Sequence, residues 1–179
     1  MSERYVSGVS GSALPQVGVV FPDADGSLYT GGTLYITPDD PFDWDVIHHE
    51  YGHYVSDRYN LDSNPGGCHN PGKNLSEDVQ KCLDASGNVK TYGPYGKDKG
   101  TKLAWGEGWP TYFALSLQRA RGGASLGIPN VGDRKYTDGG TNIDYSRGPR
   151  WDLARAVQVH IIVFAPWFHA RPSRRGDPR

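Results

Sequence analysis

Two histidines and a glutamate lie close together in the segment His49-Glu50-Tyr51-Gly52-His53, which has the pattern HExxH. Residues four apart in a helix project from the same face, so both imidazoles can bind one Zn²⁺ ion. Glu50 can then reach a zinc-bound water without being a ligand itself. With six His and four Glu in the chain, the pattern would arise by chance in about one of 200 such chains. We therefore predict a zinc site with ligands His49 and His53 and with Glu50 as the general base.

A catalytic zinc site usually has a third protein ligand and leaves one position for water. Glu107 is the first candidate, because its segment, AWGEGWPTYFA, begins a second expected helix. The metzincin extension is excluded, since it requires glycine at position 56 and histidine at position 59, where the chain has Ser56 and Tyr59. Two weaker candidates are Asp144, in a stretch faintly similar to the ligand stretch of aspzincins, and His69, beside Cys68.

The two segments HEYGH and EGWPTYF together resemble the gluzincins, the broad thermolysin-like group of zinc metallopeptidases. The resemblance covers about residues 30–58 and 103–120, less than a third of the chain. It implies Zn²⁺ as cofactor, Glu107 as third ligand and hydrolysis of a peptide bond by a zinc-bound water. It also implies a peptide or protein substrate, which would pair as an added strand with residues 33–37 at a sheet edge.

Three features depart from the gluzincin pattern. The gap from His53 to Glu107 is 54 residues, which indicates an inserted loop over residues 60–103. Thr111 stands where gluzincins often have an acidic residue that orients a ligating histidine, and Pro110 replaces a small helix former. These departures motivate an alternative function, a catalytically inactive protein of zincin fold that binds a metal or a partner. A chance motif without metal is a third possibility.

The groups that would assist the predicted ligands are less defined. Asp45 and Asp57 each lie four residues from a histidine of the motif, so either carboxylate could accept a hydrogen bond from a ligating imidazole. A donor that stabilises the developing oxyanion could be any of several residues: Tyr92, Tyr95, Tyr112, Tyr136, Tyr145 and His160.

Two helices would carry the candidate ligands. The first is expected over residues 41–58, with Asp40 as N-cap and Pro41 at the first helical position. The second is expected over residues 107–121, because Pro110 is tolerated only in the first turn of a helix. Strands are expected at residues 16–21 and 33–37, where β-branched and apolar residues cluster. Further expectations are a short helix near residues 76–83, loops over 60–103 and 123–146, and a helix or strand over 151–163.

These elements predict an α+β, zincin-like fold, in which a small mixed sheet packs on the HExxH helix and on the second ligand-bearing helix, with long loops. We expect a flexible lead-in over residues 1–15, a single domain over 16–168 and a basic tail over 169–179.

Composition narrows the function classes. Net charge is −1, which gives no electrostatic case for binding nucleic acid. The longest apolar run, residues 159–168, is too short to span a membrane. No signal peptide is evident, so we expect either a cytosolic protein or part of a longer, exported precursor. Oligomeric state is not predicted.

Two cysteines, Cys68 and Cys82, leave three alternatives open. They could form a disulfide, which would stabilise the fold by about 3 kcal/mol. They could be unrelated free thiols. They could also hold a structural zinc together with His69, although such a site would lack a fourth ligand.

Overall fold

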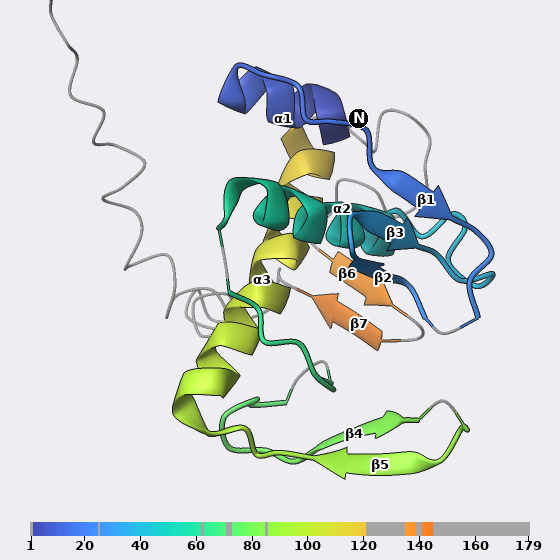
Figure 1. Ribbon diagram of the computed structural model, residues 1–179, viewed down its shortest axis with the longest axis vertical. Coiled ribbons are helices and arrows are strands. Elements are labelled where there is room, and N and C mark those ends of the chain that lie inside the picture. Colours follow the sequence, from blue (N-terminus) through green and yellow to red (C-terminus); the bar gives the residue numbers. More distant parts are fainter. Residues whose placement is uncertain are drawn as a thin grey trace, which may run out of the picture.

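The computed structural model describes residues 2–24, 26–61, 63–70, 73–84, 86–120, 135–138 and 141–144, the last two ranges by their backbone alone. The helices are α1 (Ser2–Ser10), α2 (Trp44–Tyr59) and α3 (Gly96–Ala120). The strands are β1 (Gly18–Val20), β2 (Leu28–Thr30), β3 (Thr33–Tyr35), β4 (Gln80–Leu83), β5 (Val89–Tyr92), β6 (Lys135–Asp138) and β7 (Thr141–Asp144). The expected α+β class is confirmed (Figure 1).

A three-stranded mixed sheet precedes the motif helix. Its order is β1-β3-β2, with β1 parallel and β2 antiparallel to β3. The strands expected near residues 16–21 and 33–37 are confirmed as the shorter strands β1 and β3. The expectation that residues 33–37 form a sheet edge is wrong, because β3 is paired on both sides. Leu34 and Ile36 are buried, and β3 lies against α2.

Helix α2 carries the HExxH motif and begins three residues later than expected. Its N-cap is Asp43, whose side chain accepts hydrogen bonds from the backbone N–H groups of Asp45 and Val46. Asp40 was the expected cap, but its carboxylate accepts hydrogen bonds from the hydroxyls of Ser27 and Thr37 instead. The helix begins where a free carboxylate can satisfy its first N–H groups.

Helix α3 begins at Gly96, eleven residues before Glu107. The expectation that Pro110 restricts Glu107 to the helix start is therefore wrong, because Pro110 lies inside α3. A proline there removes one backbone hydrogen bond and disturbs the preceding turn. Packing supplies the compensation, since Pro110 is fully buried against α2.

The two long helices cross very closely at Gly52 and Pro110. A Cβ at Gly52 would lie 2.7 Å from the Cα of Pro110, so only glycine fits. Beside this crossing lies the main apolar cluster, formed by Val6, Val55, Phe113 and Leu117. Tyr51 stacks on Phe113 with ring centroids 6.2 Å apart. Because the histidines of the motif flank Gly52, the crossing sets their height relative to α3.

Residues 2–10, which fall in the expected flexible lead-in, form helix α1 in the structure. Val6 from this helix is buried in the main apolar cluster, and Tyr5 packs edge-on against Phe113. The hydroxyl of Tyr54 donates a hydrogen bond to the carbonyl of Pro15. The N-terminal segment thus covers the outer side of the α2–α3 crossing.

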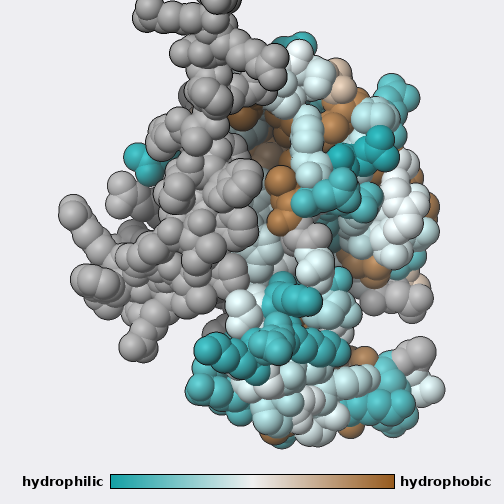
Figure 2. Space-filling view, turned by 60° about the vertical axis from the view of Figure 1, so that its left-hand side comes forward, coloured by the Kyte–Doolittle hydropathy of each residue, from teal (hydrophilic) through white to brown (hydrophobic). Residues whose placement is uncertain are grey.

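Two β-hairpins occur in regions where a short helix and loops were expected. Residues 76–83 do not form a helix: strand β4 begins at Gln80 and pairs antiparallel with β5. In the second expected loop β6 pairs with β7, and β6 lies close to α2. The β4–β5 hairpin projects from the lower end of α3, and that end of the molecule is mostly hydrophilic on the face seen in Figure 2.

The expected helix or strand over residues 151–163 and the basic tail lie outside the described residues. Among the residues that are described, no helix is both long and apolar enough to cross a membrane.

Candidate metal centre

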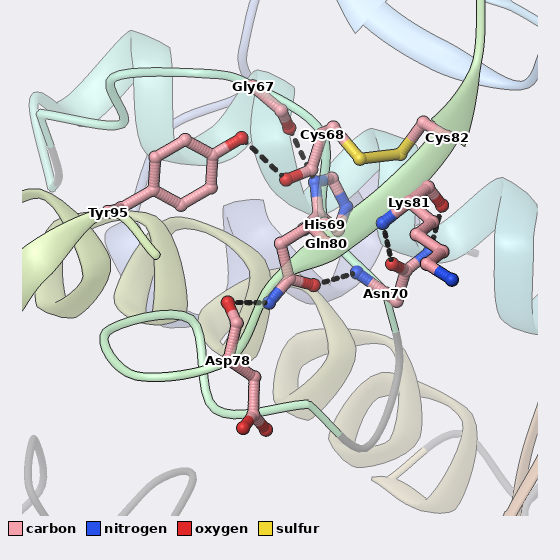
Figure 3. The surroundings of a disulfide bond; sticks show 9 residues. All are labelled: Gly67, Cys68, His69, Asn70, Asp78, Gln80, Lys81, Cys82 and Tyr95. Carbon is pink, nitrogen blue, oxygen red and sulfur yellow. Dashed lines mark hydrogen bonds between the residues drawn. A yellow bond between two sulfur atoms is a disulfide. The ribbon is translucent and has the colours of Figure 1, made fainter. Parts of the chain in front are cut away.

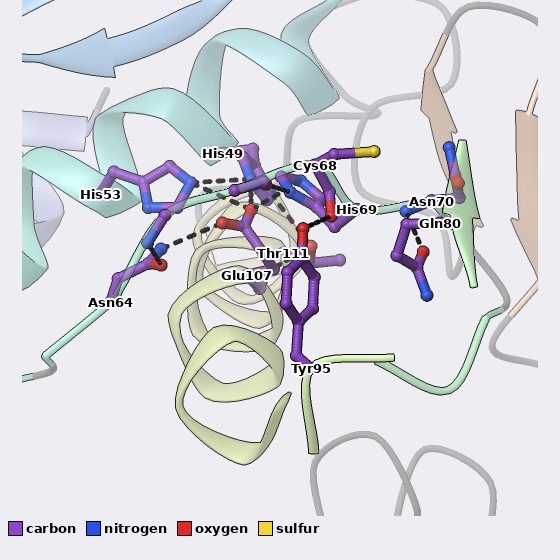
Figure 4. A network of polar contacts seen from close by, with 12 residues as sticks. His49, His53, Asn64, Cys68, His69, Asn70, Gln80, Tyr95, Glu107 and Thr111 are labelled. Atoms are coloured by element: carbon purple, nitrogen blue, oxygen red, sulfur yellow. Dashed lines mark hydrogen bonds and ion pairs between the residues drawn. The ribbon is translucent and has the colours of Figure 1, made fainter. Parts of the chain in front are cut away.

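His49, His53 and Glu107 converge on one point between α2 and α3 (Figure 4). The Nε2 atoms of the two histidines are 3.1 Å apart. Each of them lies 3.4 Å from Oε2 of Glu107. All three side chains are largely covered, with Glu107 19% exposed.

The spacing of these atoms fits a metal ion. A tetrahedral zinc ion with bonds of about 2.0–2.1 Å keeps its ligand atoms about 3.3–3.4 Å apart. The separations among the two imidazoles and the carboxylate are 3.1 to 3.4 Å. His49, Glu50 and His53 also form a group whose ligand atoms lie within 4.8 Å of one another. The structure therefore has a candidate metal site that resembles that of the zincins.

Thr111 determines which nitrogen of His49 faces this point. Its hydroxyl donates a hydrogen bond to the carbonyl of Glu107, at 3.0 Å. The same oxygen lies 3.0 Å from Nδ1 of His49 and must therefore accept from that nitrogen. The proton of a neutral His49 then resides on Nδ1, which leaves the lone pair of Nε2 free to bind a metal. Thr111, noted above as a departure, thus does what the acidic residue was expected to do.

The two aspartates considered for this role have other partners. Asp45 is buried one helical turn before His49, and its Oδ1 accepts a hydrogen bond from Gln118 at 2.8 Å. Asp57 accepts a hydrogen bond from the hydroxyl of Tyr29 at 2.7 Å. They tie α2 to α3 and to the sheet, respectively.

Asn64 holds the carboxylate of Glu107 from the other side. Its Nδ2 donates to Oε1 of Glu107 at 3.0 Å, which leaves Oε2 facing the histidines. This contact requires Gly106, because a Cβ at that position would overlap the Asn64 side chain. The glycine before Glu107 therefore makes room for a residue that orients it.

The close approach of these side chains shifts the pKa values of Glu107 and His49. Burial by itself raises the pKa of Glu107, but the hydrogen bonds from three surrounding histidines outweigh it and hold that pKa well below its usual range. Burial lowers the pKa of His49 despite the neighbouring Glu107. These shifts favour an ionised Glu107 and a neutral His49, which are the forms in which the two side chains can bind a metal.

Glu50 lies beside this group, with a carboxylate oxygen within 4.8 Å of the ligand nitrogens of His49 and His53. It is only 7% exposed. Burial raises its pKa to about 7, while the charge of His53 and a hydrogen bond from the Tyr29 backbone act in the opposite direction. A carboxyl group with a pKa near neutrality can both take up and release a proton.

A third histidine, His69, lies at the same point, although sequence reasoning gave it little weight. Its Nε2 is 3.3 Å from Oε2 of Glu107. Burial by itself lowers the pKa of His69, but the interaction with Glu107 outweighs it and raises the pKa to about 9. The only signal in the sequence was its position next to Cys68. The disulfide between Cys68 and Cys82 is confirmed, which excludes a structural zinc bound by these two thiols.

Among the remaining candidates, those whose side chains the structure describes do not join this group. The Tyr95 hydroxyl donates to the carbonyl of Cys68, while Tyr92 and Tyr112 are exposed. Asp144 ends strand β7, and Tyr136 lies in β6, where only the backbone is described. Two candidates, Tyr145 and His160, lie outside the described residues.

No model of a known protein family, no curated protein and no solved structure matches this chain. The functional assignment therefore depends on the geometry and chemistry of the site itself.

Proposed function

We propose that this protein is a zinc-dependent metallopeptidase, with His49, His53 and Glu107 as metal ligands and Glu50 as general base. The observation that carries the proposal is the convergence of two imidazoles and one carboxylate at the spacing of a tetrahedral site. Their neighbours support it, because Thr111 and Asn64 orient a ligand each. An HExxH helix that crosses a glutamate-bearing helix is also the arrangement that the gluzincin resemblance implies.

The chain's own residues would perform the proton transfers. Bound zinc would supply activation of water and polarisation of a peptide carbonyl. Glu50 would accept the proton of the attacking water and then deliver it to the leaving amine. Its buried position beside the ligands, and a pKa raised to about 7 chiefly by burial, suit a group that must do both.

Strand β2 is the best candidate for the substrate edge, in place of residues 33–37. Among the described strands, β2 pairs only with β3 and therefore lies at one edge of the three-stranded sheet. The backbone of its Tyr29 hydrogen-bonds to Glu50. A peptide that paired with β2 as an added strand would therefore pass the proposed general base.

Metal content provides the first test. We expect protein purified without chelator to hold about one zinc per chain, as in a three-ligand site, and Glu107→Ala to lose most of it. Zinc retained in both proteins would move the third ligand to another residue. A wild-type protein without zinc, even after zinc is added back, would refute the assignment.

A non-catalytic metal-binding protein is the second candidate function, and one observation favours it. His69 lies where a fourth ligand would stand, and a fourth protein ligand leaves no position for water. Turnover of an unfolded protein substrate by zinc-loaded wild type and by zinc-loaded His69→Ala separates the two candidates. Activity in either protein supports the peptidase, while its absence from both supports the non-catalytic function.

A further inference from the structure

His69 lies as close to Glu107 as the two proposed histidine ligands do. Its Nε2 lies 3.3 Å from Oε2 of Glu107, compared with 3.4 Å for both His49 and His53. A tetrahedral zinc ion holds its four ligand atoms about 3.3–3.4 Å apart. Three imidazole nitrogens thus lie 3.3 to 3.4 Å from one carboxylate oxygen, the spacing expected between one corner of a tetrahedral site and the other three.

The hydrogen bond of the other ring nitrogen prepares His69 for metal binding. Nδ1 of His69 lies 2.9 Å from the carbonyl oxygen of Gly67. A carbonyl can only accept, so Nδ1 must be the donor. In the neutral ring the lone pair is then on Nε2, the atom that faces Glu107. His49 has the same arrangement through Thr111.

The backbone on both sides of His69 is fixed (Figure 3). On one side, Cys68 is bonded to Cys82 in strand β4, and its carbonyl accepts a hydrogen bond from the Tyr95 hydroxyl. On the other side, the Asn70 side chain exchanges two hydrogen bonds with the backbone of Lys81, and the Asn70 backbone N–H donates a third to Oε1 of Gln80. The histidine is therefore placed by the β4–β5 hairpin and its disulfide, and not by a free loop.

We propose that His69 is a fourth protein ligand of the metal and that the Cys68–Cys82 disulfide holds it there. This inference rests on the proposed metal site of His49, His53 and Glu107. In the disulfide-bonded chain the metal site is then closed, with three histidines and one glutamate. Of the four side chains, His69 is the most exposed to solvent, with 42% of its side-chain surface accessible. Departure of His69 would open the position that water needs for catalysis.

Two other roles for His69 make different predictions. As a protonated partner of Glu107 alone, it would matter only in the metal-free chain, and its removal would not change the surroundings of a bound metal. As a proton donor to the substrate, it would be needed for turnover but not for metal affinity. Metal affinity and the number of imidazoles at the metal therefore distinguish the three roles.

The experiment compares four proteins loaded with zinc: wild type, His69→Ala, the Cys68→Ser/Cys82→Ser double variant and Lys90→Ala. Lys90 lies on the exposed part of the same hairpin and pairs with Asp84, so its substitution is the matched control. Zinc affinity is measured by competition with a chromophoric chelator. X-ray absorption at the zinc edge counts the imidazole ligands.

We expect three imidazoles in wild type and two in His69→Ala. The zinc affinity of His69→Ala should fall at least about tenfold, since even the loss of a residue that orients a ligand costs 10- to 100-fold. The double serine variant should show a smaller loss, and Lys90→Ala none. Turnover of a protein substrate should be higher in His69→Ala than in wild type.

An unchanged zinc affinity and two imidazoles in wild type would overturn the proposal. Unchanged affinity together with lost turnover in His69→Ala would also overturn it, in favour of a proton donor. Failure of the proposed function looks different, because then wild type itself would bind no zinc, or no variant would show turnover.

Discussion

The α2–α3 crossing and the segment 63–70 both deliver residues to the candidate metal centre, but by different physical means. The crossing is held by apolar packing around Phe113 and by the close approach of Gly52 and Pro110. Segment 63–70 has no regular structure of its own. It is positioned by a disulfide and by hydrogen bonds to β4 and Tyr95.

This difference indicates how each region should respond to perturbation. Residues on the crossing have partners in a buried core, so we expect their positions to be independent of a bound ion. The groups from segment 63–70, Asn64 and His69, reach the site from the solvent side through polar contacts. Polar contacts near the surface are individually worth about 1 kcal/mol. We therefore expect the crossing to keep its geometry without a metal ion and segment 63–70 to be the more sensitive of the two regions to metal removal.

The largest effect is expected from Glu50→Gln, which tests chemistry on the crossing without changing its packing. The variant keeps the shape of the side chain but cannot accept a proton. Turnover should fall by about 100- to 10,000-fold, with zinc content equal to that of the parent. Turnover of Glu50→Gln is compared with that of its parent in two backgrounds, wild type and His69→Ala. Full activity of Glu50→Gln in both backgrounds would contradict the proposed role of Glu50.

Metal removal should separate the two regions. A ligand at 100 times its dissociation constant stabilises the folded state by about 2.7 kcal/mol, so chelation should lower the melting temperature. Amide exchange should increase mainly in residues 63–70 and remain slow in the core-facing parts of α2 and α3. Glu107→Ala is the control, because chelator should not change its stability. Equal loosening of both regions would show that the metal also supports the helical scaffold.

Gly52→Ala tests the crossing directly. Alanine ordinarily stabilises a helix relative to glycine by about 0.5–1 kcal/mol. Here the new Cβ would meet the backbone of Pro110, so we expect a loss of about 1–3 kcal/mol in the free energy of unfolding. Urea denaturation measures it, with Arg58→Ala, an exposed change in the same helix, as control. A stabilising Gly52→Ala would show that the helices do not approach as closely as described.

The smallest effect is expected at Thr111, where the packing stays and only one acceptor is lost. Thr111→Val removes the oxygen that accepts from Nδ1 of His49. Zinc affinity should fall about tenfold, at the lower end of the range for residues that orient ligands. Thr111→Ser, which keeps the hydroxyl, should bind zinc like wild type. Equal affinities of the valine and serine variants would exclude an orienting role.

The sequence alone was sufficient to single out the candidate residues of the site that lie on helices α2 and α3. Two histidines four apart must share a face of any helix, so the HExxH pattern predicts their convergence before the fold is known. Glu107 was a candidate because its segment, EGWPTYF, resembles the gluzincin pattern, and the structure places it 3.4 Å from both histidines. Helix boundaries were less accurate, because Asp40 and Asp43 have equal capping propensity. Asp40 is engaged instead by the hydroxyls of Thr37 and of Ser27, which lies 13 residues away in the sequence.

Only the tertiary structure decided the other half. The position of β3 at the centre of its sheet depends on pairing with β1 and β2, which short strands do not specify by periodicity. The interior position of Pro110 depends on its contact with Gly52. His69 and Asn64 reach Glu107 from a segment without periodicity, through a disulfide that closes a 14-residue separation. Local patterns determine which residues share a face, while contacts between distant segments determine which faces meet.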